Sequence, residues 1–253
     1  MRPGIDFIVV DYQTPADLSG FLTSLVEFPP EVPWSLTVAL VSPGPEDERV
    51  AKEFGVLHDT VQFTKNVGYA RAVNRASIFG DHETLAIFNA DTKLTKGVAT
   101  ECHNALHSNP AWAIVGPRQI DERGTITHGG IFQSERGFHQ PNSEEYGDVR
   151  EDATTVSGSA YFIKRAVWKE LTNCPHYAQY HAEGAFLPTQ HYYEETWCSW
   201  HARAHRYKVV YYGAATMIHK WHASSPRGGY ADKQVTNSKR MFEEACAAHG
   251  ENV

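Results

Sequence analysis

The sequence predicts an α/β fold: a mostly parallel, doubly wound sheet with helices on both faces. Two observations support this prediction. Along the first part of the chain, short apolar runs typical of strands alternate with amphipathic segments typical of helices, and the connections between them are short. In addition, the run at residues 85–88 is hydrophobic on both faces, which is typical of a central strand covered on two sides.

The elements of the first part have recognisable start and stop signals. Thr14-Pro15-Ala16-Asp17 offers a capping residue, a proline at the first helical position and an acid three residues after the cap. The helix that follows ends before Pro29, and Gly55 and Gly80 are placed to end the next two helices. The expected strands are residues 5–12, 34–41, 56–63 and 84–88, and the other expected helices are residues 45–54 and 67–79.

The second part is less regular. A helix is expected after Thr95, because Val98, Cys102 and Leu106 recur at helical spacing before Asn109-Pro110. The expected strands are residues 113–120, 125–132, 154–163, 207–212 and 215–218; the expected helices are residues 193–205 and 236–249; and the expected loops are residues 133–152 and 224–234. Residues 173–191 show no clean period and predict no element.

Composition narrows the class of protein. The chain has 253 residues, enough for one large α/β domain, and 42% hydrophobic with 21% charged residues is ordinary for a globular protein. A formal net charge of −7 argues against a nucleic-acid partner. The four cysteines form no CxxC pair, which favours buried, reduced thiols. No signal sequence or membrane-length apolar stretch is found, so we expect a cytoplasmic protein whose membrane contact, if any, is peripheral.

The strand at residues 84–88 is followed by Asn89, Ala90 and Asp91. Ligands of open α/β sheets bind at the carboxyl ends of the strands, which is where these side chains are expected. A carboxylate there can hold a divalent cation, and the cation can hold a diphosphate. The alternative is that Asn89 and Asp91 only cap the loop and the next helix.

Residues 65–74 contain a second candidate ligand site. Gly68 at a helix entrance lets a ligand approach the backbone, and the free N–H groups there favour anionic or carbonyl groups. Arg71 and Asn74 lie three residues apart and share one helical face. The alternative is a capped helix with one solvated arginine, although a buried asparagine would need hydrogen-bond partners.

The expected helix at residues 193–205 begins with two acids, Glu194 and Glu195. The helix dipole stabilises negative charge at this position. The two carboxylates are therefore either a functional pair or simple partners of the dipole.

Taken in order, these segments resemble the family 2 inverting glycosyltransferases of the GT-A fold, particularly the rhamnosyltransferase-like and galactofuranosyltransferase-like branch. The resemblance runs from about residue 5 to about residue 225 and depends on motif order rather than on close identity. The motifs that carry it are Ile8-Val9-Val10-Asp11-Tyr12, Asn66-Val67-Gly68 with Asn74, Asn89-Ala90-Asp91, Val115-Gly116-Pro117, Gly124-Thr125-Ile126-Thr127-His128-Gly129-Gly130, Val156-Ser157-Gly158-Ser159-Ala160, Tyr193-Glu194-Glu195 and His219.

The resemblance implies a Rossmann-like GT-A domain over residues 1–253. Residues 1–92 would form the nucleotide-sugar half, 93–222 the acceptor and catalytic half with a small β/α region, and 223–253 a mobile loop and C-terminal helix. The implied activity is metal-dependent, inverting transfer from a UDP-, GDP- or dTDP-sugar to a hydroxyl of a glycan, glycolipid or protein acceptor.

The resemblance also implies a role for individual residues. Asp91 and His219 would hold Mn²⁺ or Mg²⁺, and Glu195 would be the general base, with Glu194 as the competing candidate. The nucleotide-sugar would be bound by Tyr12, Thr14, Asn66, Gly68, Arg71, Asn74, Asn89, Ala90 and Arg227. The acceptor side would be formed by Ser157, Gly158, Ser159 and Trp221. Arg227, Tyr230 and Lys233 could close with their loop over the diphosphate.

Three positions depart from the family pattern. Asn89 stands in place of the first acid of the metal motif, Ser42 stands near where relatives often carry an acid that reads the base, and Glu195 replaces the more usual aspartate. These departures leave open a catalytically weak or inactive relative that binds a nucleotide or a glycan.

Two further classes are disfavoured by the sequence. A nucleotidyltransferase would carry a glycine-rich basic loop after the first strand, where this chain has Asp11-Tyr12-Gln13-Thr14-Pro15. The 14 histidines are scattered, and His219 with His222 is only a short pair, so the spacing does not predict a zinc site.

Overall fold

The computed structural model describes residues 1–55, 58–134, 137–139, 149–220 and 232–250. The first part contains β1 (Arg2–Asp11), α1 (Pro15–Glu27), β2 (Trp34–Val41), α2 (Pro45–Glu53), β3 (Asp59–Phe63), α3 (Tyr69–Ala76) and β4 (His82–Asn89). The middle contains β5 (Thr92–Lys93), α4 (Val98–Ser108), β6 (Trp112–Ile120), β7 (Ile126–His128), β8 (Phe132–Ser134), β9 (Gly137–His139) and β10 (Val149–Arg150). The last part contains β11 (Ala160–Lys164), α5 (Arg165–Thr172), a short 3-10 helix (Ala178–Tyr180), α6 (Glu194–Ala204), β12 (Lys208–His219) and α7 (Asp232–Ala248).

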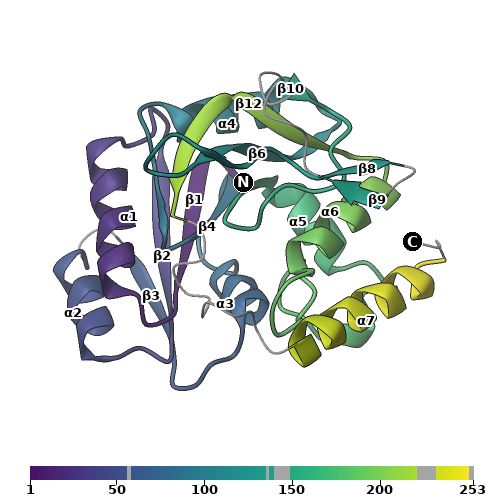
Figure 1. Cartoon of the computed structure of the whole chain (residues 1–253), viewed down its shortest axis with the longest axis horizontal. Helices are drawn as coiled ribbons and strands as arrows, with labels where there is room; N and C mark the ends of the chain where they lie inside the picture. The colour runs from purple at the N-terminus through teal and green to yellow at the C-terminus, as the bar shows by residue number, and fades with distance from the viewer. Residues whose placement is uncertain (56–57, 135–136, 140–148, 221–231, 251–253) are drawn as a thin grey trace.

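A large central sheet organises the chain (Figure 1). Its strand order is β10-β12-β6-β11-β4-β1-β2-β3, with β5 paired to β12 and β7 paired to β6. The strands β3, β2, β1 and β4 are parallel, as are β6 and β12. In the described part of the sheet, β11 lies between β4 and β6 and runs antiparallel to both of them. The mostly parallel sheet that the sequence predicts is therefore confirmed.

Helices cover both faces of this sheet because its central strands are apolar on both sides. On one face, β1 residues such as Phe7 pack against α1, α2 and α4 in one buried cluster. On the other face, Ile8 and its neighbours pack against α3, α5 and α6. The helix α7 forms a third layer, packing on α6 through Phe242 and Ala245 (Figure 1). This layered arrangement confirms the α/β class.

Several predicted boundaries are wrong, each for a physical reason. The strand expected at residues 154–163 begins only at Ala160, and Ser157, Gly158 and Ser159 form the turn before it. Val156 instead packs against Gly116 of β6, where an added Cβ would lie 2.4 Å from the valine Cβ. The strands expected at residues 207–212 and 215–218 are one strand, β12, with a register shift between Tyr212 and Thr216.

Other boundaries differ at the ends of helices and in the loops. The helix expected after Thr95 begins at Val98, behind Gly97, whose φ is +82°. The last helix begins at Asp232 instead of residue 236. The loop expected at residues 133–152 contains the short strands β9 and β10 in the part that the structure describes. No helix among the described residues is long and apolar enough to cross a membrane.

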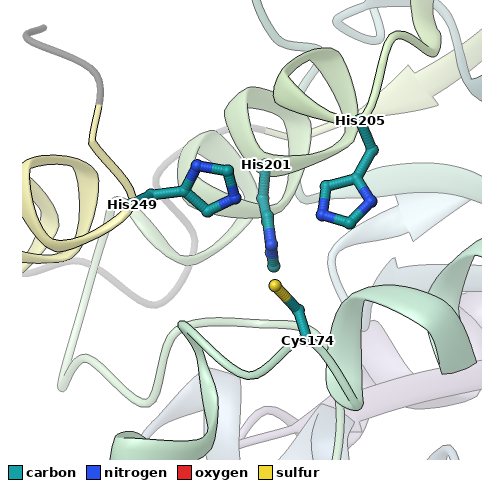
Figure 2. A group of neighbouring side chains, drawn as sticks. All are labelled: Cys174, His201, His205 and His249. Carbon is teal, nitrogen blue, oxygen red and sulfur yellow. The ribbon is translucent and has the colours of Figure 1, made fainter.

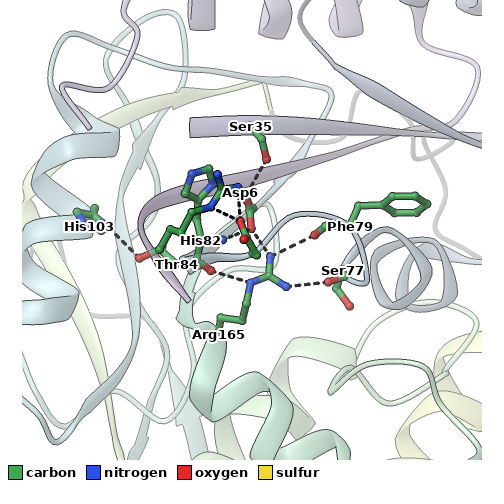
Figure 3. A network of polar contacts seen from close by, with 10 residues as sticks. Asp6, Ser35, Ser77, Phe79, His82, Thr84, His103 and Arg165 are labelled. Atoms are coloured by element: carbon green, nitrogen blue, oxygen red, sulfur yellow. Dashed lines mark hydrogen bonds and ion pairs between the residues drawn. The ribbon is translucent and has the colours of Figure 1, made fainter. Parts of the chain in front are cut away.

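A buried ion-pair network fastens the sheet at the amino ends of β1 and β4 (Figure 3). The Asp6 carboxylate of β1 pairs with the Arg165 guanidinium from α5 and accepts hydrogen bonds from the His82 backbone N–H (2.9 Å) and the Ser35 hydroxyl (2.6 Å). Arg165 also donates to the carbonyl oxygens of His82 (2.7 Å) and Ser77 (2.9 Å). Asp6 and Arg165 are 3% and 2% exposed, so each charge depends on the other.

The network predicts a large stability loss on changing Asp6 to Asn. The substitution keeps the side-chain size but leaves the buried guanidinium without its counter-charge, which costs about 3–5 kcal/mol in free energy of unfolding. Urea denaturation monitored by circular dichroism measures the change. The control is Asp81→Asn, which breaks an ion pair with Arg2 on the surface, where the Asp81 side chain is 57% exposed. Equal losses in the two variants would show that the buried network is not a special source of stability.

Candidate active site

A pocket of about 260 Å³ lies at the carboxyl edge of the parallel strands. Loops and helix ends from both parts of the chain meet there, as expected for an open α/β sheet. Its lining residues are Val10, Tyr12, Thr14, Val41, Asn66, Gly68, Tyr69, Asn89, Ala90, Asp91, Ser157, Gly158, Ser159, Gln190, His191, Tyr192, Glu194, Glu195, His219 and Gln234.

Asp91 and His219 face one another at the floor of the pocket. The Asp91 Oδ1 atom lies 3.5 Å from His219 Nε2, and both side chains are less than a tenth exposed. Asp91 follows β4, and its carbonyl oxygen accepts a hydrogen bond of 3.0 Å from the Lys220 N–H at the end of β12. Among the residues that the structure describes, the buried Asp91 Oδ1 has no hydrogen-bond partner. A carboxylate and an imidazole that converge in this way can hold a divalent cation.

The end of β1 forms the wall beside Thr14. The Asp11 carboxylate accepts hydrogen bonds from the Thr14 hydroxyl (2.7 Å) and the Thr14 N–H (3.2 Å). Burial, followed by repulsion from Asp47, raises the pKa of Asp11 to about 6, against the lowering effect of the Thr14 hydrogen bonds. Gln13 has a φ of +57° and donates to the Ser42 carbonyl at 2.9 Å, which joins the ends of β1 and β2. Tyr12 and Thr14 are thus held at the mouth of the pocket.

The entrance of α3 is a glycine turn. The side-chain oxygen Oδ1 of Asn66 accepts a hydrogen bond of 2.9 Å from the Gly68 N–H, and Gly68 has a φ of +83°. A Cβ at Gly68 would lie 2.9 Å from the Gln190 carbonyl oxygen, so the position requires glycine for its conformation and for space. Tyr69 follows, and its hydroxyl donates to the Gly158 carbonyl at 2.7 Å. Burial, then the negative field of Glu194, Glu195 and Asp91, raises the Tyr69 pKa well above its usual range.

Glu194 and Glu195 enter the pocket from the first turn of α6. Glu194 is 6% exposed, and its carboxylate accepts a hydrogen bond of 3.2 Å from the Thr189 hydroxyl. Burial, then repulsion from Glu195, raises the Glu194 pKa to about 8. Burial also raises the pKa of Glu195, which is partly exposed and packs against Gly158. Carboxyl groups with raised pKa values are typical of sites that move protons.

The backbone before α6 is strained. Tyr192 and Tyr193 have φ values of +65° and +70°, a left-handed conformation that costs a non-glycine residue roughly 1–3 kcal/mol. Tyr193 is held by stacking on Phe242 of α7, with ring centroids 5.5 Å apart. Strain of this kind persists only where packing enforces it, and it clusters at functional sites. Here it fixes the direction in which α6 starts.

The turn before β11 forms another wall of the pocket. The Ser159 hydroxyl lies 2.7 Å from that of Ser157 and donates to the Gln119 amide oxygen at 2.8 Å. Ser159 Oγ also lies 3.5 Å from His219 Nδ1. Behind this wall, burial and then repulsion from His219 lower the His128 pKa to about 4, so that His128 is neutral. Sequence-predicted Ser157, Gly158 and Ser159 therefore do reach the pocket.

The structure places two of the predicted nucleotide-binding residues elsewhere. Asn74 lies on the buried face of α3. Its side-chain amide donates to the Phe186 carbonyl (2.7 Å) and accepts a hydrogen bond from the Phe186 N–H (3.1 Å). Its hydrogen bonds therefore fix the irregular segment before α6, and Asn74 is not among the residues that line the pocket. Arg71 is exposed and does not line the pocket.

Most of the predicted mobile loop lies outside the described residues. Trp221, Arg227 and Tyr230 lie outside the described residues. Lys233 is exposed in the first turn of α7, so the expectation that it belongs to the loop is wrong. The adjacent Gln234 does line the pocket.

Several lining residues had not been singled out from the sequence. Tyr69 directly follows the predicted Gly68 and could have been found by that adjacency. Gln190 and His191 belong to the segment without periodicity, and Tyr192 directly follows it. Gln234 comes from a helix far away in the chain. No local signal therefore indicates these residues.

Comparison with known proteins identifies the fold. No protein-family model matches the sequence, and no curated protein matches it. Solved structures match with high probability, among them the mannosyltransferase PcManGT from Pyrobaculum calidifontis in complex with GDP-Man and Mn²⁺, GalNAc-T7 with UDP, GalNAc and Mn²⁺, and S. aureus TarS. Their TM-scores are 0.68, 0.68 and 0.61, at 14%, 11% and 13% sequence identity.

The matches cover 100%, 96% and 97% of this chain but 66%, 50% and 65% of the respective neighbours, so the chain spans between half and two thirds of their length. These neighbours are GT-A-type glycosyltransferases. The chain therefore has a GT-A-type fold, as the sequence resemblance predicts. The rhamnosyltransferase-like and galactofuranosyltransferase-like branch stays a prediction.

The raised pKa of Glu194 predicts how stability depends on pH. Between its ordinary value of 4.5 and its folded value of about 8, the folded chain retains a proton that the unfolded chain has released. Stability therefore falls as pH rises through this window. Glu194→Gln removes the titration, so the melting temperature of the variant relative to wild type should rise from pH 5 to pH 8 in metal-free buffer.

Differential scanning fluorimetry at several pH values measures this difference. Glu183→Gln, which changes an exposed glutamate, is the control and should follow the wild-type curve at every pH. If the Glu194→Gln and wild-type curves stay parallel, the assigned pKa of Glu194 is wrong.

Proposed function

We propose that the protein is a metal-dependent inverting glycosyltransferase. It would transfer a sugar from a nucleotide-diphosphate sugar to an acceptor hydroxyl by a single displacement. The observation that carries this proposal is the composition of one pocket. A cation-binding pair, Asp91 and His219, and a pair of carboxylates with raised pKa values, Glu194 and Glu195, lie in the same cavity at the carboxyl edge of a GT-A-type sheet.

The residues at Asp91 and His219 fit a divalent cation. The buried Asp91 Oδ1, which has no hydrogen-bond partner in the described part of the chain, is the kind of atom that a cation satisfies, and His219 Nε2 lies beside it. Carboxylate oxygens suit both Mn²⁺ and Mg²⁺, whereas an imidazole ligand favours Mn²⁺ over the strictly oxygen-seeking Mg²⁺. When bound, the cation would supply positive charge to balance the leaving diphosphate.

The wall formed by β1, β2 and α3 would hold the nucleotide. Tyr12 and Val41 offer aromatic and apolar surface, and Thr14 and Asn66 offer polar groups at the mouth of the pocket. Gly68 also lines the pocket, and its lack of a side chain leaves room for the backbone of Gln190, another lining residue. Asn89 and Ala90, between this wall and Asp91, would lie beside the sugar and ribose. The neighbours PcManGT and GalNAc-T7 were crystallised with GDP-Man and UDP respectively, which supports a nucleotide-sugar as donor.

Glu195 is our candidate for the general base. It packs beside Gly158, in the turn that we assign to the acceptor with Ser157 and Ser159, and it is more exposed to the pocket than Glu194. Its carboxylate would take the proton of the acceptor hydroxyl while that oxygen forms a bond to the anomeric carbon and the bond to the diphosphate oxygen breaks on the other side. Glu194, whose carboxylate accepts a hydrogen bond from the Thr189 hydroxyl, remains the competing candidate.

A catalytically weak or inactive relative is the second candidate function. Asn89 in place of an acid leaves Asp91 as the only carboxylate of the metal motif. Such a protein would bind a nucleotide or glycan in the same pocket without sugar transfer. Turnover measurements separate it from the first proposal.

Nucleotide binding is the first prediction of this proposal. UDP, GDP and dTDP are screened by thermal shift with Mn²⁺, Mg²⁺ or a chelator. At a concentration of 100 times its Kd, a ligand that binds only the folded chain adds about 2.7 kcal/mol, or roughly 5–10 °C in melting temperature. We expect one nucleotide to give such a shift with Mn²⁺ and far less with the chelator.

Asp91→Asn should abolish the metal-dependent part of the shift, because the variant loses a charged ligand. Asp59→Asn changes an exposed aspartate on β3 and should keep the full shift. If no nucleotide raises the melting temperature of the wild-type protein, the proposal of a metal–diphosphate site is wrong.

Turnover is the second prediction. Glu195→Gln should lower kcat for donor hydrolysis and for transfer by about 10²–10⁴-fold while it leaves nucleotide binding intact. Glu194→Gln should have the smaller effect, and Glu183→Gln, on the surface, should have none. If the first two effects are reversed, Glu194 is the base. The anomeric configuration of the product, measured by proton NMR, should be opposite to that of the donor; retention would contradict a single displacement.

A further inference from the structure

Away from the pocket, four side chains from three segments converge at one point (Figure 2). Cys174 follows α5, His201 and His205 lie on α6, and His249 follows α7. Taking one atom from each, a sulfur and three ring nitrogens all lie within 4.8 Å of one another.

Local structure explains why these side chains meet. His201 and His205 are four residues apart on α6, so they lie on the same helical face one turn from each other. Cys174 is fixed by a turn in which its N–H donates to the Leu171 carbonyl (3.2 Å) and its carbonyl accepts the Tyr177 N–H (2.9 Å). The packing of α7 on α6 brings the end of α7, with His249, to the same place.

His201 is the strongest indication that the cluster binds something. Its side chain is fully buried, and neither ring nitrogen has a hydrogen-bond partner among the described residues. A buried imidazole in this state loses its hydrogen bonds to water without replacing them. A neutral imidazole has one unprotonated ring nitrogen, and that nitrogen is a potential metal ligand.

His205 has the outer partner that is typical of a metal-binding histidine. Its Nδ1 atom lies 2.8 Å from a carboxylate oxygen of Glu170 on α5, and the other oxygen of Glu170 accepts the Tyr207 hydroxyl at 2.8 Å. A carboxylate that takes the proton of one ring nitrogen leaves the other nitrogen as an electron-pair donor and fixes the orientation of the ring.

We propose that Cys174, His201, His205 and His249 bind one structural zinc ion. One thiolate and three imidazoles form a ligand set that zinc binds tetrahedrally, and four protein ligands leave no open position for catalysis. In such a site, with Zn–N near 2.0 Å and Zn–S near 2.3 Å, ligand atoms are roughly 3.3–3.7 Å apart. Small side-chain rotations would close the present separations, which are at most 4.8 Å.

The proposed ion would join the segment after α5 and the ends of α6 and α7. The opposite ends of α6 and α7 carry Glu194, Glu195 and Gln234, which line the pocket. The ion would thus brace the two helices that build one side of the candidate active site. This inference does not depend on the proposed sugar transfer.

A second group of potential ligands fits a metal less well. Glu83, His103 and His107 also come within 4.8 Å of one another. There, however, the Thr84 hydroxyl lies 2.8 Å from His103 Nδ1 and 2.9 Å from His107 Nε2, so each ring already has a hydrogen-bonding neighbour. This group also lacks a thiol. It therefore supplies a histidine control for the proposed zinc site.

The test is the metal content of the full-length protein without a histidine tag, measured by inductively coupled plasma mass spectrometry. We expect about one zinc ion per chain in wild type. Cys174→Ser and His249→Ala should lose the ion. Glu170→Gln should keep the ligands but bind zinc roughly 10–100-fold more weakly in competition with a chelating dye.

The controls are Asp91→Asn and His107→Ala, which should retain the full zinc content because they alter the pocket and the second histidine group.

Cobalt loading of the wild-type protein is a second test and needs no variant. We expect a thiolate-to-cobalt charge-transfer band in its absorption spectrum. If Cys174→Ser fails to fold, His249→Ala tests the site, because His249 is only half-buried and lies near the end of the described residues.

Three results would overturn the proposal. The first is a wild-type protein without zinc whose melting temperature responds to neither zinc nor chelator. The second is zinc content that is unchanged in both Cys174→Ser and His249→Ala. The third is zinc that is lost in Asp91→Asn but kept in His249→Ala, which would assign the ion to the pocket instead.

Discussion

The buried ion pair between Asp6 and Arg165 is the constraint on which the rest of the structure depends. It fastens β1 to the start of α5, and the same carboxylate binds His82 at the start of β4 (Figure 3). Because these bonds fix the amino ends of the strands, the carboxyl ends can be followed by strained turns at Gln13 and Ser42 and by the buried carboxylate of Asp91. One edge of the sheet thus stabilises the fold, while the other carries the candidate site.

The pocket itself is costly for the protein to maintain. Asp91, Glu194 and Glu195 place three carboxyl groups around one cavity, and all three raise the pKa of Tyr69. Carboxylates this close to one another repel when all of them are charged. A bound cation would relieve this repulsion, and protonation of Glu194 relieves it in the free protein. Binding of the proposed cation and protonation of a carboxyl group with a raised pKa would therefore both lower the repulsion among these carboxylates.

The sequence was sufficient for features with local signals and insufficient for features that depend on distant contacts. Apolar runs and capping residues predicted β1 to β4 and the edge at which Asn89 and Asp91 lie. The family resemblance places Asn74 beside the nucleotide, and nothing local in the sequence shows that the Asn74 amide is instead bonded to Phe186. The zinc ligands come from three segments that only tertiary packing joins, so their spacing indicated no metal site. Tyr192 and Gln234 reach the pocket for the same non-local reason.

The reversed direction of β11 has a consequence for how such a protein can diversify. A parallel strand delivers only its last residues to the carboxyl edge, whereas β11 begins there, so the turn of Ser157, Gly158 and Ser159 comes before its strand. This turn can therefore change in length or sequence without altering the connections of β1 to β4. One side of the pocket could therefore diversify at a single short turn while the part built by β1 to β4 stays the same.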